Sequence, residues 1–118
     1  MSIRATIPFE FSVGDKILPA GEYRIQQVNA SSDLAMLQVT SANGEARVLI
    51  RVQSIRADRT SRTALVFNRY GSSYFLSTLA IEGATDAWQT LKSHAERGAG
   101  RELAALKLDG ERVAVLTR

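Results

Sequence analysis

The chain has no cysteine and a single histidine, His94, among its 118 residues. The first absence excludes disulfides, thiolate nucleophiles and thiolate metal sites. A hydrolytic triad would have to be built around His94, and Ser93 is too close in sequence to be a well-placed nucleophile. Metal sites usually need several histidines, cysteines or clustered carboxylates, and the acidic residues here are scattered singly. The glycine-containing stretch 98–100 lacks the preceding strand and following lysine of a phosphate loop. We therefore predict no catalytic residue, no metal site and no cofactor, and we interpret His94 as a surface residue in the first turn of a helix.

Long apolar runs are also missing. No stretch approaches the roughly 18 consecutive apolar residues of a membrane span. Residues 1–5 contain no apolar signal core, so we expect that the chain as given is not exported by that route and is cytoplasmic as it stands, and its location is otherwise left open. Hydrophobic residues make up 45% of the sequence and charged residues 23%, which is typical of a globular protein. The length favours one domain, 1–118, with its own core.

What the sequence does contain is two-residue alternation of apolar and polar side chains, the pattern of strands with one buried face. The first such strand covers residues 7–13, with Ile7, Phe9, Phe11 and Val13 on one face. Further strands are expected at 22–26, 34–40, 47–53, 64–70, 73–81 and 113–116. Turn-forming pairs separate several of them, namely Gly14-Asp15, Asn43-Gly44 and Gly71-Ser72.

Toward the C-terminus the apolar period changes to that of a helix. The residues at this spacing are Leu91, Ala95, Ala99, Leu103 and Leu106. Ser93, followed three residues later by Glu96, fits a capping box at a helix start. Gly98 and Gly100 each cost a helix about 1 kcal/mol relative to alanine. They favour a division into a turn near Ser93 and a better helix over 101–106.

These patterns predict a mainly β fold: a single antiparallel β-sandwich or partly open barrel of about seven strands, with a short C-terminal helical segment. Sandwich and barrel produce the same one-dimensional pattern, so both stay open. Tyr70 and Tyr74 are expected to form a cross-strand pair beside the Gly71 hairpin, with Trp88 covering one end of the sandwich. The expected core residues are Phe9, Phe11, Tyr23, Ile25, Ile50, Val52, Phe67 and Leu76.

The opening of the chain and two later stretches carry a resemblance to a known family. Residues 7–16, Ile-Pro-Phe-Glu-Phe-Ser-Val-Gly-Asp-Lys, and 18–23, Leu-Pro-Ala-Gly-Glu-Tyr, resemble the opening of a family of small uncharacterised β-rich proteins abundant in acidobacteria. Residues 65–71 together with 74–76, and residues 92–97, resemble it too. The resemblance spans most of residues 5–97 and implies the β-rich fold, but it implies no activity. Members typically carry an export signal, so the resemblance also implies an extracytoplasmic location for proteins of this type.

The sequence is consistent with two main hypotheses about the function of the protein. The leading one is a non-enzymatic structural or interaction module that self-associates into a homo-oligomer through an exposed strand edge. The alternative is an anion- or polysaccharide-binding domain, because arginines outnumber acids over residues 47–69, where Asp58 is the lone acid. An enzyme with a deep pocket of convergent polar groups is a third hypothesis.

The candidate ligand-binding residues are arginines of one strand and its adjoining loop, together with one aromatic side chain. They are Arg47, Arg51, Arg56, Arg59, Arg62 and Trp88. Arginine favours bidentate contacts with anions where several groups converge. The competing interpretation is that the same arginines cover the solvated face of a strand and pair with scattered acids. Nucleic acid would require exposed aromatic rings for stacking, and most rings here lie in strand patterns.

Overall fold

The structure is a computed structural model that describes residues 2–31, 34–56 and 62–117. These residues form ten strands and one helix, so the predicted mainly β fold with a short C-terminal helix is confirmed. The elements are β1 (Ser2–Ile7), β2 (Phe11–Val13), β3 (Lys16–Leu18), β4 (Gly21–Ser31), β5 (Leu34–Ser41), β6 (Arg47–Arg56), β7 (Ala64–Tyr70), β8 (Ser73–Ala80), β9 (Asp86–Thr90), α1 (His94–Ala105) and β10 (Glu111–Leu116).

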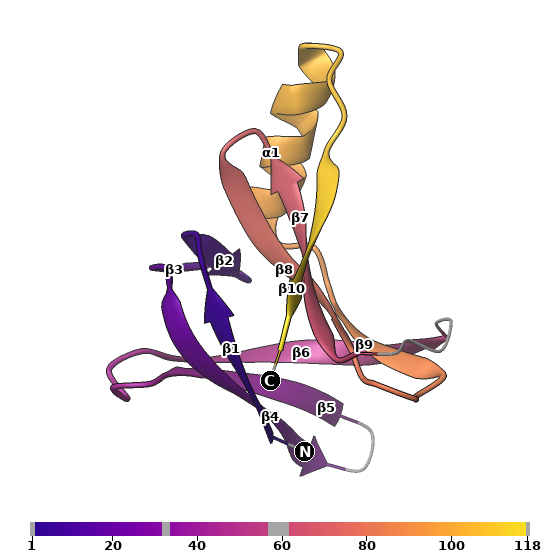
Figure 1. Ribbon diagram of the computed structural model, residues 1–118. Helices are drawn as coiled ribbons and strands as arrows, with labels where there is room; N and C mark the ends of the chain where they lie inside the picture. The colour runs from indigo at the N-terminus through magenta and orange to yellow at the C-terminus, as the bar shows by residue number, and fades with distance from the viewer. Residues whose placement is uncertain (1, 32–33, 57–61, 118) are drawn as a thin grey trace.

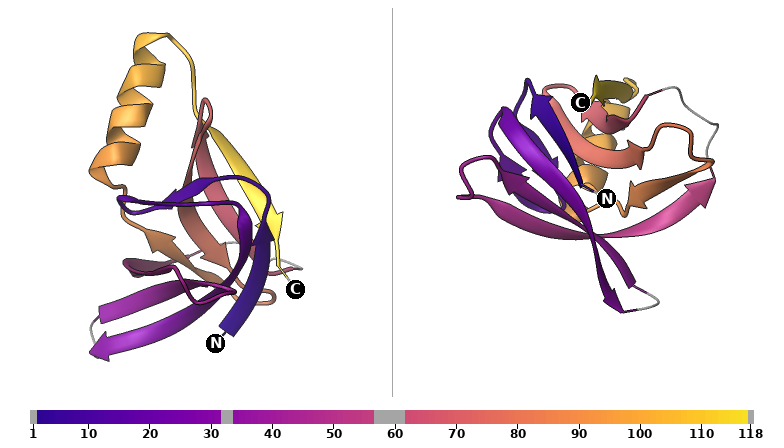
Figure 2. Two further views of the ribbon diagram at one scale, coloured as in Figure 1. Left: turned by 90° about the vertical axis from the view of Figure 1, so that its left-hand side faces the viewer. Right: turned by 60° about the horizontal axis from the view of Figure 1, so that its bottom comes forward.

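The strands belong to one sheet, which does not close into a barrel. Its main path runs β1-β4-β5-β6-β9-β8, after which β8 pairs with β7 and β7 pairs with β10. All these pairs are antiparallel, and a single parallel bridge between Ser12 and Phe75 attaches β2 to β8. In Figures 1 and 2, β7, β8 and β10 rise away from the layer of β4, β5 and β6, and α1 stands beside them.

The strand count exceeds the expected seven because several short elements subdivide the pattern. Within the stretch expected as one strand over 7–13, Ile7 is the last residue of β1, residues 8–10 lie between strands, and Phe11–Val13 form β2. Pro8 lacks a backbone N–H and cannot continue a ladder there. The expected alternation survives this break, since Ile7, Phe11 and Val13 are all buried. The short strands β3 and β9 were not anticipated.

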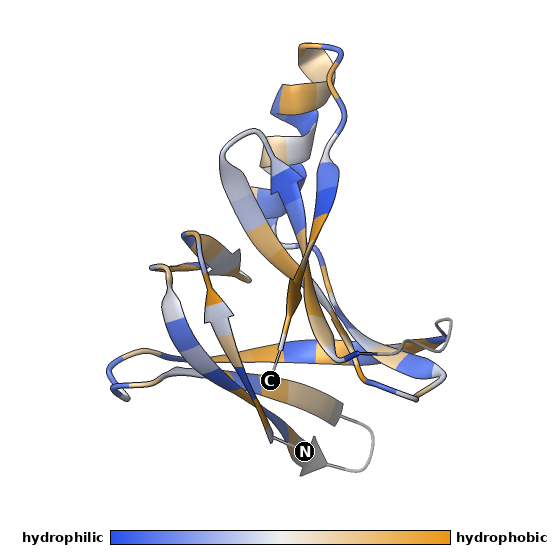
Figure 3. Ribbon diagram, viewed as in Figure 1, coloured by the Kyte–Doolittle hydropathy of each residue, from blue (hydrophilic) through white to orange (hydrophobic). Residues whose placement is uncertain are grey.

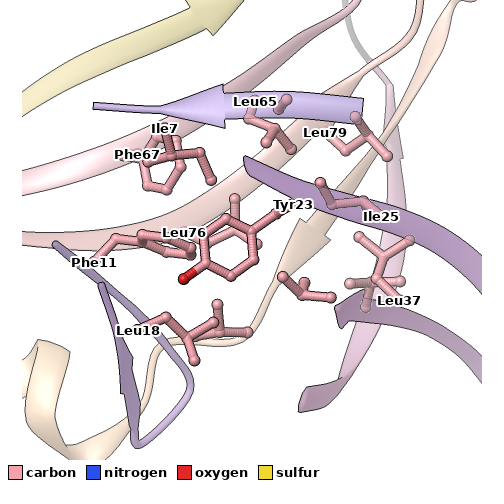
Figure 4. Close-up of a cluster of buried hydrophobic side chains, with 14 residues drawn as sticks. Ile7, Phe11, Leu18, Tyr23, Ile25, Leu37, Leu65, Phe67, Leu76 and Leu79 are labelled. Atoms are coloured by element: carbon pink, nitrogen blue, oxygen red, sulfur yellow. The ribbon is translucent and has the colours of Figure 1, made fainter. Parts of the chain in front are cut away.

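The core lies between the layer of β4, β5 and β6 and the strands that rise away from it. Figure 4 shows buried side chains from both groups of strands lying close together. Six of the eight predicted core residues are buried, and Phe9 and Ile50 are partly buried against them. The ring of Phe11 meets those of Tyr23 and Phe67 edge to face at 5.1 and 5.5 Å between centroids, a favoured aromatic geometry. The buried hydroxyl of Tyr23 donates a 2.6 Å hydrogen bond to the carbonyl of Pro19. That bond satisfies the polar end of an otherwise apolar side chain.

The C-terminal helix is continuous, so the expected division at Gly98 and Gly100 is wrong. Ser93 is the N-cap as predicted, and its Oγ accepts a 3.1 Å hydrogen bond from the N–H of Glu96. Gly100 lies against Tyr70, because a Cβ built on it would come 3.6 Å from a carbon of that ring. Tertiary packing of this kind outweighs intrinsic propensity in a helix. No helix of the described residues is long and apolar enough to cross a membrane.

The aromatic pair expected beside the Gly71 hairpin does not form. The two-residue turn is present, but the register places Tyr70 opposite Ser73, and Tyr74 opposite Arg69. Tyr74 instead stacks on Phe9 with ring centroids 3.8 Å apart, and Tyr70 makes its contacts with α1. A bulge between Val66 and Phe67 shifts the register in this hairpin, a detail that the one-dimensional pattern does not contain.

Candidate functional site

The predicted arginine set divides between two faces of the sheet. Arg47 and Arg51 are exposed and alternate with Val48, Ile50 and Val52, which face the core side of β6. Figure 3 shows the accompanying change of hydropathy along β6. Arg56, expected in a loop, is the last residue of β6, stands opposite Asp86, and by strand alternation faces away from Arg51.

The remaining candidates are not gathered around Arg47 and Arg51. Arg59 lies outside the described residues, and Arg62 is an exposed residue that precedes β7. Trp88 is part of β9, where it stands opposite Leu79 and packs partly buried against the core. It therefore does not cover an open end of a sandwich, and its ring is on the core side of the sheet. The set of six named from the sequence does not form one site in the described residues.

Strand register assembles a different group of arginines. Arg4 in β1 stands directly opposite Arg24 in β4, and Arg24 stands opposite Thr40 in β5. Thr40 in turn stands opposite Arg47 in β6. Arg4 and Arg24 are exposed and alternate with the buried residues of their strands, so all these side chains project from the outer face of the sheet.

Arg51 belongs to the same face, two positions beyond Leu49 along β6 and opposite Met36. We call the outward side chains of Arg4, Arg24, Arg47 and Arg51 the arginine face. Its three strand spacings from β1 to β6 correspond to about 14 Å, and the step from Arg47 to Arg51 to about 13 Å. Charges spread over such an area match an extended ligand better than one small ion.

The arginine face is only partly compensated by acidic side chains, since Glu22 shares the hollow of Arg4 and Arg24. An ion pair on β7 and β10 joins Arg69 to Glu111 at 3.8 Å, and among the described residues none of these four arginines takes part in an ion pair. Like charges directly opposite one another on neighbouring strands destabilise a sheet, as Arg4 and Arg24 do here. The repulsion between Arg4 and Arg24 therefore lowers the stability of the fold, and a bound anion would reduce that repulsion.

Two surface hollows adjoin Arg4. One has a volume of about 240 Å³ and is lined by Arg4, Glu22, Tyr23, Arg24 and Ala42. The other, about 410 Å³, lies along β1 and shares Arg4 and Glu22 with the first. Both arginines of the cross-strand pair thus line the same concavity, and Glu22 is the acidic residue that shares it.

A second polar cluster joins α1 to β7. Glu96 is 3% exposed, and its Oε2 accepts 2.9 Å hydrogen bonds from Asn68 Nδ2 and from the hydroxyl of Tyr70. Burial, followed by the hydrogen bond and charge of Glu96, raises the pKa of Tyr70 to about 12. At neutral pH this hydroxyl is therefore a donor and not a base. The cluster holds the helix to the sheet and presents no activated nucleophile.

Sequence reasoning missed the most compact part of the arginine face. The alternation of Tyr23 and Ile25 with Arg24 already indicated an outward Arg24, but its partner depends on which strand lies beside β4. That neighbour is β1 and not the adjacent segment β3. Without the strand order, Arg4 and Arg24 are two isolated charges 20 positions apart in the sequence.

No protein-family model, curated protein or solved structure matches this chain. The resemblance to the acidobacterial family therefore stays a prediction.

Proposed function

We propose that this protein is a non-enzymatic binding module that presents the arginine face to an acidic polysaccharide. The observation that supports the proposal is the convergence of four unpaired arginines from β1, β4 and β6 on one face. Their spacing suits a chain of repeated anionic groups, each contacted by one or two guanidinium forks. Attraction between such a face and a polyanion accelerates association and weakens with salt.

The side chains around these arginines favour a polysaccharide over single-stranded nucleic acid. Base recognition without sequence preference uses aromatic rings on which successive bases stack. The outward neighbours of the arginines on β4 and β5 are Gln26, Gln38, Thr40 and Met36. Tyr23 and the phenylalanine rings of the described residues are buried or partly buried in the core. Amides and hydroxyls suit hydrogen bonds with sugar hydroxyl groups.

The test compares two variants that lose the same positive charge from different places. The face variant carries Arg4→Gln, Arg24→Gln, Arg47→Gln and Arg51→Gln. The control carries Arg97→Gln, Arg101→Gln, Lys107→Gln and Arg112→Gln, all exposed positions around α1 and β10. Retention on immobilised heparin is read as the salt concentration of elution.

The face variant is expected to elute near the dead volume, whereas the control elutes close to the unaltered protein. An equal loss of heparin retention in both variants would show that retention depends only on net charge, and this result would overturn the proposal. Retention on single-stranded DNA at higher salt than on heparin would reassign the ligand to nucleic acid.

One observation favours self-association as a second candidate function. The six-residue strand β10 pairs with β7 on one side, and no strand of the described residues pairs with its other side. Leu116 at its end is 50% exposed. An unpaired edge with apolar side chains is a template for strand addition. We propose that β10 joins a second copy of this chain; a molecular mass that stays monomeric in light scattering at high concentration would refute this.

A further inference from the structure

We propose that Arg4 and Arg24 form a subsite for one tetrahedral oxyanion, a sulfate or phosphate ester group of the bound polymer. The inference rests on the proposed function, because it assigns the ligand class of the same face. It goes beyond that function by separating the four arginines into a chelating pair, Arg4 with Arg24, and two single contacts, Arg47 and Arg51.

The pair is set apart by its register. Arg4 and Arg24 are direct cross-strand partners, and the Cβ atoms of such partners lie about 5 Å apart. Arg47 faces Thr40 and Arg51 faces Met36, so neither has a second guanidinium beside it. Two guanidinium groups on adjacent strands can approach one anion from two sides, whereas a lone arginine approaches from one.

The pair also lines a concavity. The hollow of about 240 Å³ is bounded by both arginines together with Glu22, Tyr23 and Ala42. A water molecule's share of liquid volume is about 30 Å³, so the hollow has room for a tetrahedral group and its ester linkage. Arg4, Glu22 and Arg24 are exposed, so the hollow stays open to water, and what it provides is one concave place that both guanidinium groups adjoin.

The number of acceptor oxygens selects the ligand. A guanidinium fork offers two parallel N–H donors, so two forks offer four. A carboxylate has two oxygens in one plane, and one fork already contacts both of them. A sulfate or phosphate ester has three terminal oxygens, which can accept from both forks together. The arrangement therefore favours a sulfated or phosphorylated polymer over one that carries only carboxylates.

Glu22 modulates the subsite. It is exposed, lies two positions from Arg24 on the same face, and lines the hollow without an ion pair to either arginine. Its carboxylate reduces the positive potential of the hollow and repels an incoming anion. Replacement of Glu22 by glutamine is expected to strengthen binding of a sulfated ligand.

The test measures affinities for three soluble polymers at one salt concentration. Heparin carries sulfate groups, polyphosphate carries phosphate groups, and hyaluronate carries only carboxylates. The proteins are the unaltered chain, the pair variant Arg4→Gln with Arg24→Gln, the single-contact variant Arg47→Gln with Arg51→Gln, and Arg24→Lys. The two double variants remove equal charge, and circular dichroism with thermal unfolding checks the fold of each.

Loss of the charged hydrogen bonds of one arginine is expected to cost about tenfold in affinity. The pair variant, which loses two arginines, is therefore expected to bind heparin about a hundredfold more weakly. The single-contact variant is expected to lose clearly less. Arg24→Lys, which keeps charge but not the fork, should lose several-fold for heparin and little for hyaluronate. Stronger binding of heparin than polyphosphate by the unaltered chain identifies sulfate as the source, and the reverse order identifies phosphate.

Equal losses in the two double variants, or equal binding of hyaluronate and heparin by the unaltered chain, would overturn the subsite while leaving the proposed function intact. Absence of binding to all three polymers would overturn the proposed function itself, and the subsite with it.

Discussion

The hydroxyl of Tyr70 donates a 2.9 Å hydrogen bond to Oε2 of Glu96, and so joins β7 to the first turn of α1. The ring of Tyr70 lies against Gly100 of the helix and Gly110 of the following turn. One side chain thereby contacts the interior of α1 and the residue that directly precedes β10. This contact explains how a helix with two interior glycines stays continuous beside the sheet.

Tyr70 makes stability depend on pH in the alkaline range. Its pKa is raised to about 12 in the folded chain, against 10.0 for the ordinary group. Below pH 10 the hydroxyl is protonated in both states and its stabilisation is complete. As the pH rises from 10 through 12, the unfolded chain loses this proton first, so the free energy of unfolding falls.

Tyr70→Phe removes that contribution, so its unfolding free energy should fall less steeply above pH 10. Burial also raises the pKa of Tyr23, so some alkaline loss should remain in the variant. Urea denaturation at a series of pH values between 8 and about 11.5 measures both slopes. Identical slopes for the two proteins would show that Tyr70 titrates normally.

Loss of the Glu96 carboxylate should destabilise the helix attachment. Glu96→Ala leaves the Tyr70 hydroxyl and Asn68 Nδ2 without their acceptor, at an expected cost of about 1–3 kcal/mol. Glu102→Ala removes an exposed acid from the same helix and should change stability by less than about 0.5 kcal/mol. Chemical denaturation followed by circular dichroism compares them. A Glu96→Ala variant as stable as the Glu102→Ala control would contradict the arrangement.

Two glycine substitutions should act in opposite directions. A Cβ on Gly98 meets no atom within 4 Å, and the position is helical, so Gly98→Ala should stabilise the chain by about 0.4–1 kcal/mol. A Cβ on Gly110 would come within 2.9 Å of the Tyr70 ring and 3.2 Å of the Arg69 carbonyl oxygen. Gly110→Ala should therefore cost about 1–3 kcal/mol. Thermal unfolding of both variants gives the signs, and a stabilising Gly110→Ala would show that Tyr70 does not occupy this place.

Much of the local structure could be predicted because it depends on neighbours in the sequence. The alternation around Tyr23 and Ile25 identified their buried face, and the turns at Gly14-Asp15 and Gly71-Ser72 follow from residues that accept positive φ. Ser93 was identifiable as a helix cap from its own side chain and its spacing to Glu96. These features require no knowledge of which strand lies beside which.

The candidate site could not be predicted because it depends on strand order and on contacts between distant segments. Arg4 stands opposite Arg24 because β1 pairs with β4, although β2 and β3 lie between these two strands in the sequence. Tyr70 meets Glu96 across 26 positions of sequence. Glu96 likewise matched a capping box in the sequence, but its carboxylate accepts hydrogen bonds from Asn68 and Tyr70 of β7.

The cross-strand arginine pair should itself cost stability. Arg24→Gln removes the repulsion between Arg24 and Arg4, so the variant should unfold at a slightly higher temperature at low ionic strength, by about 0.2–1 kcal/mol in free energy. The difference should shrink as salt screens the two charges. Arg112→Gln, on β10 opposite Asn68, serves as the control and should show little change. Scanning calorimetry at low and high salt provides the comparison, and a destabilised Arg24→Gln would show that the pair is not repulsive.

The most direct test of the arginine face is a titration of the isotope-labelled protein with a heparin fragment, followed by NMR of its arginine side-chain N–H signals. We expect the signals of Arg4 and Arg24 to shift at the lowest ligand concentration and those of Arg47 and Arg51 next, while those of Arg97, Arg101 and Arg112 stay in place. Shifts that begin at the arginines of α1 and β10, or no shifts at any arginine, would contradict a ligand site on the arginine face.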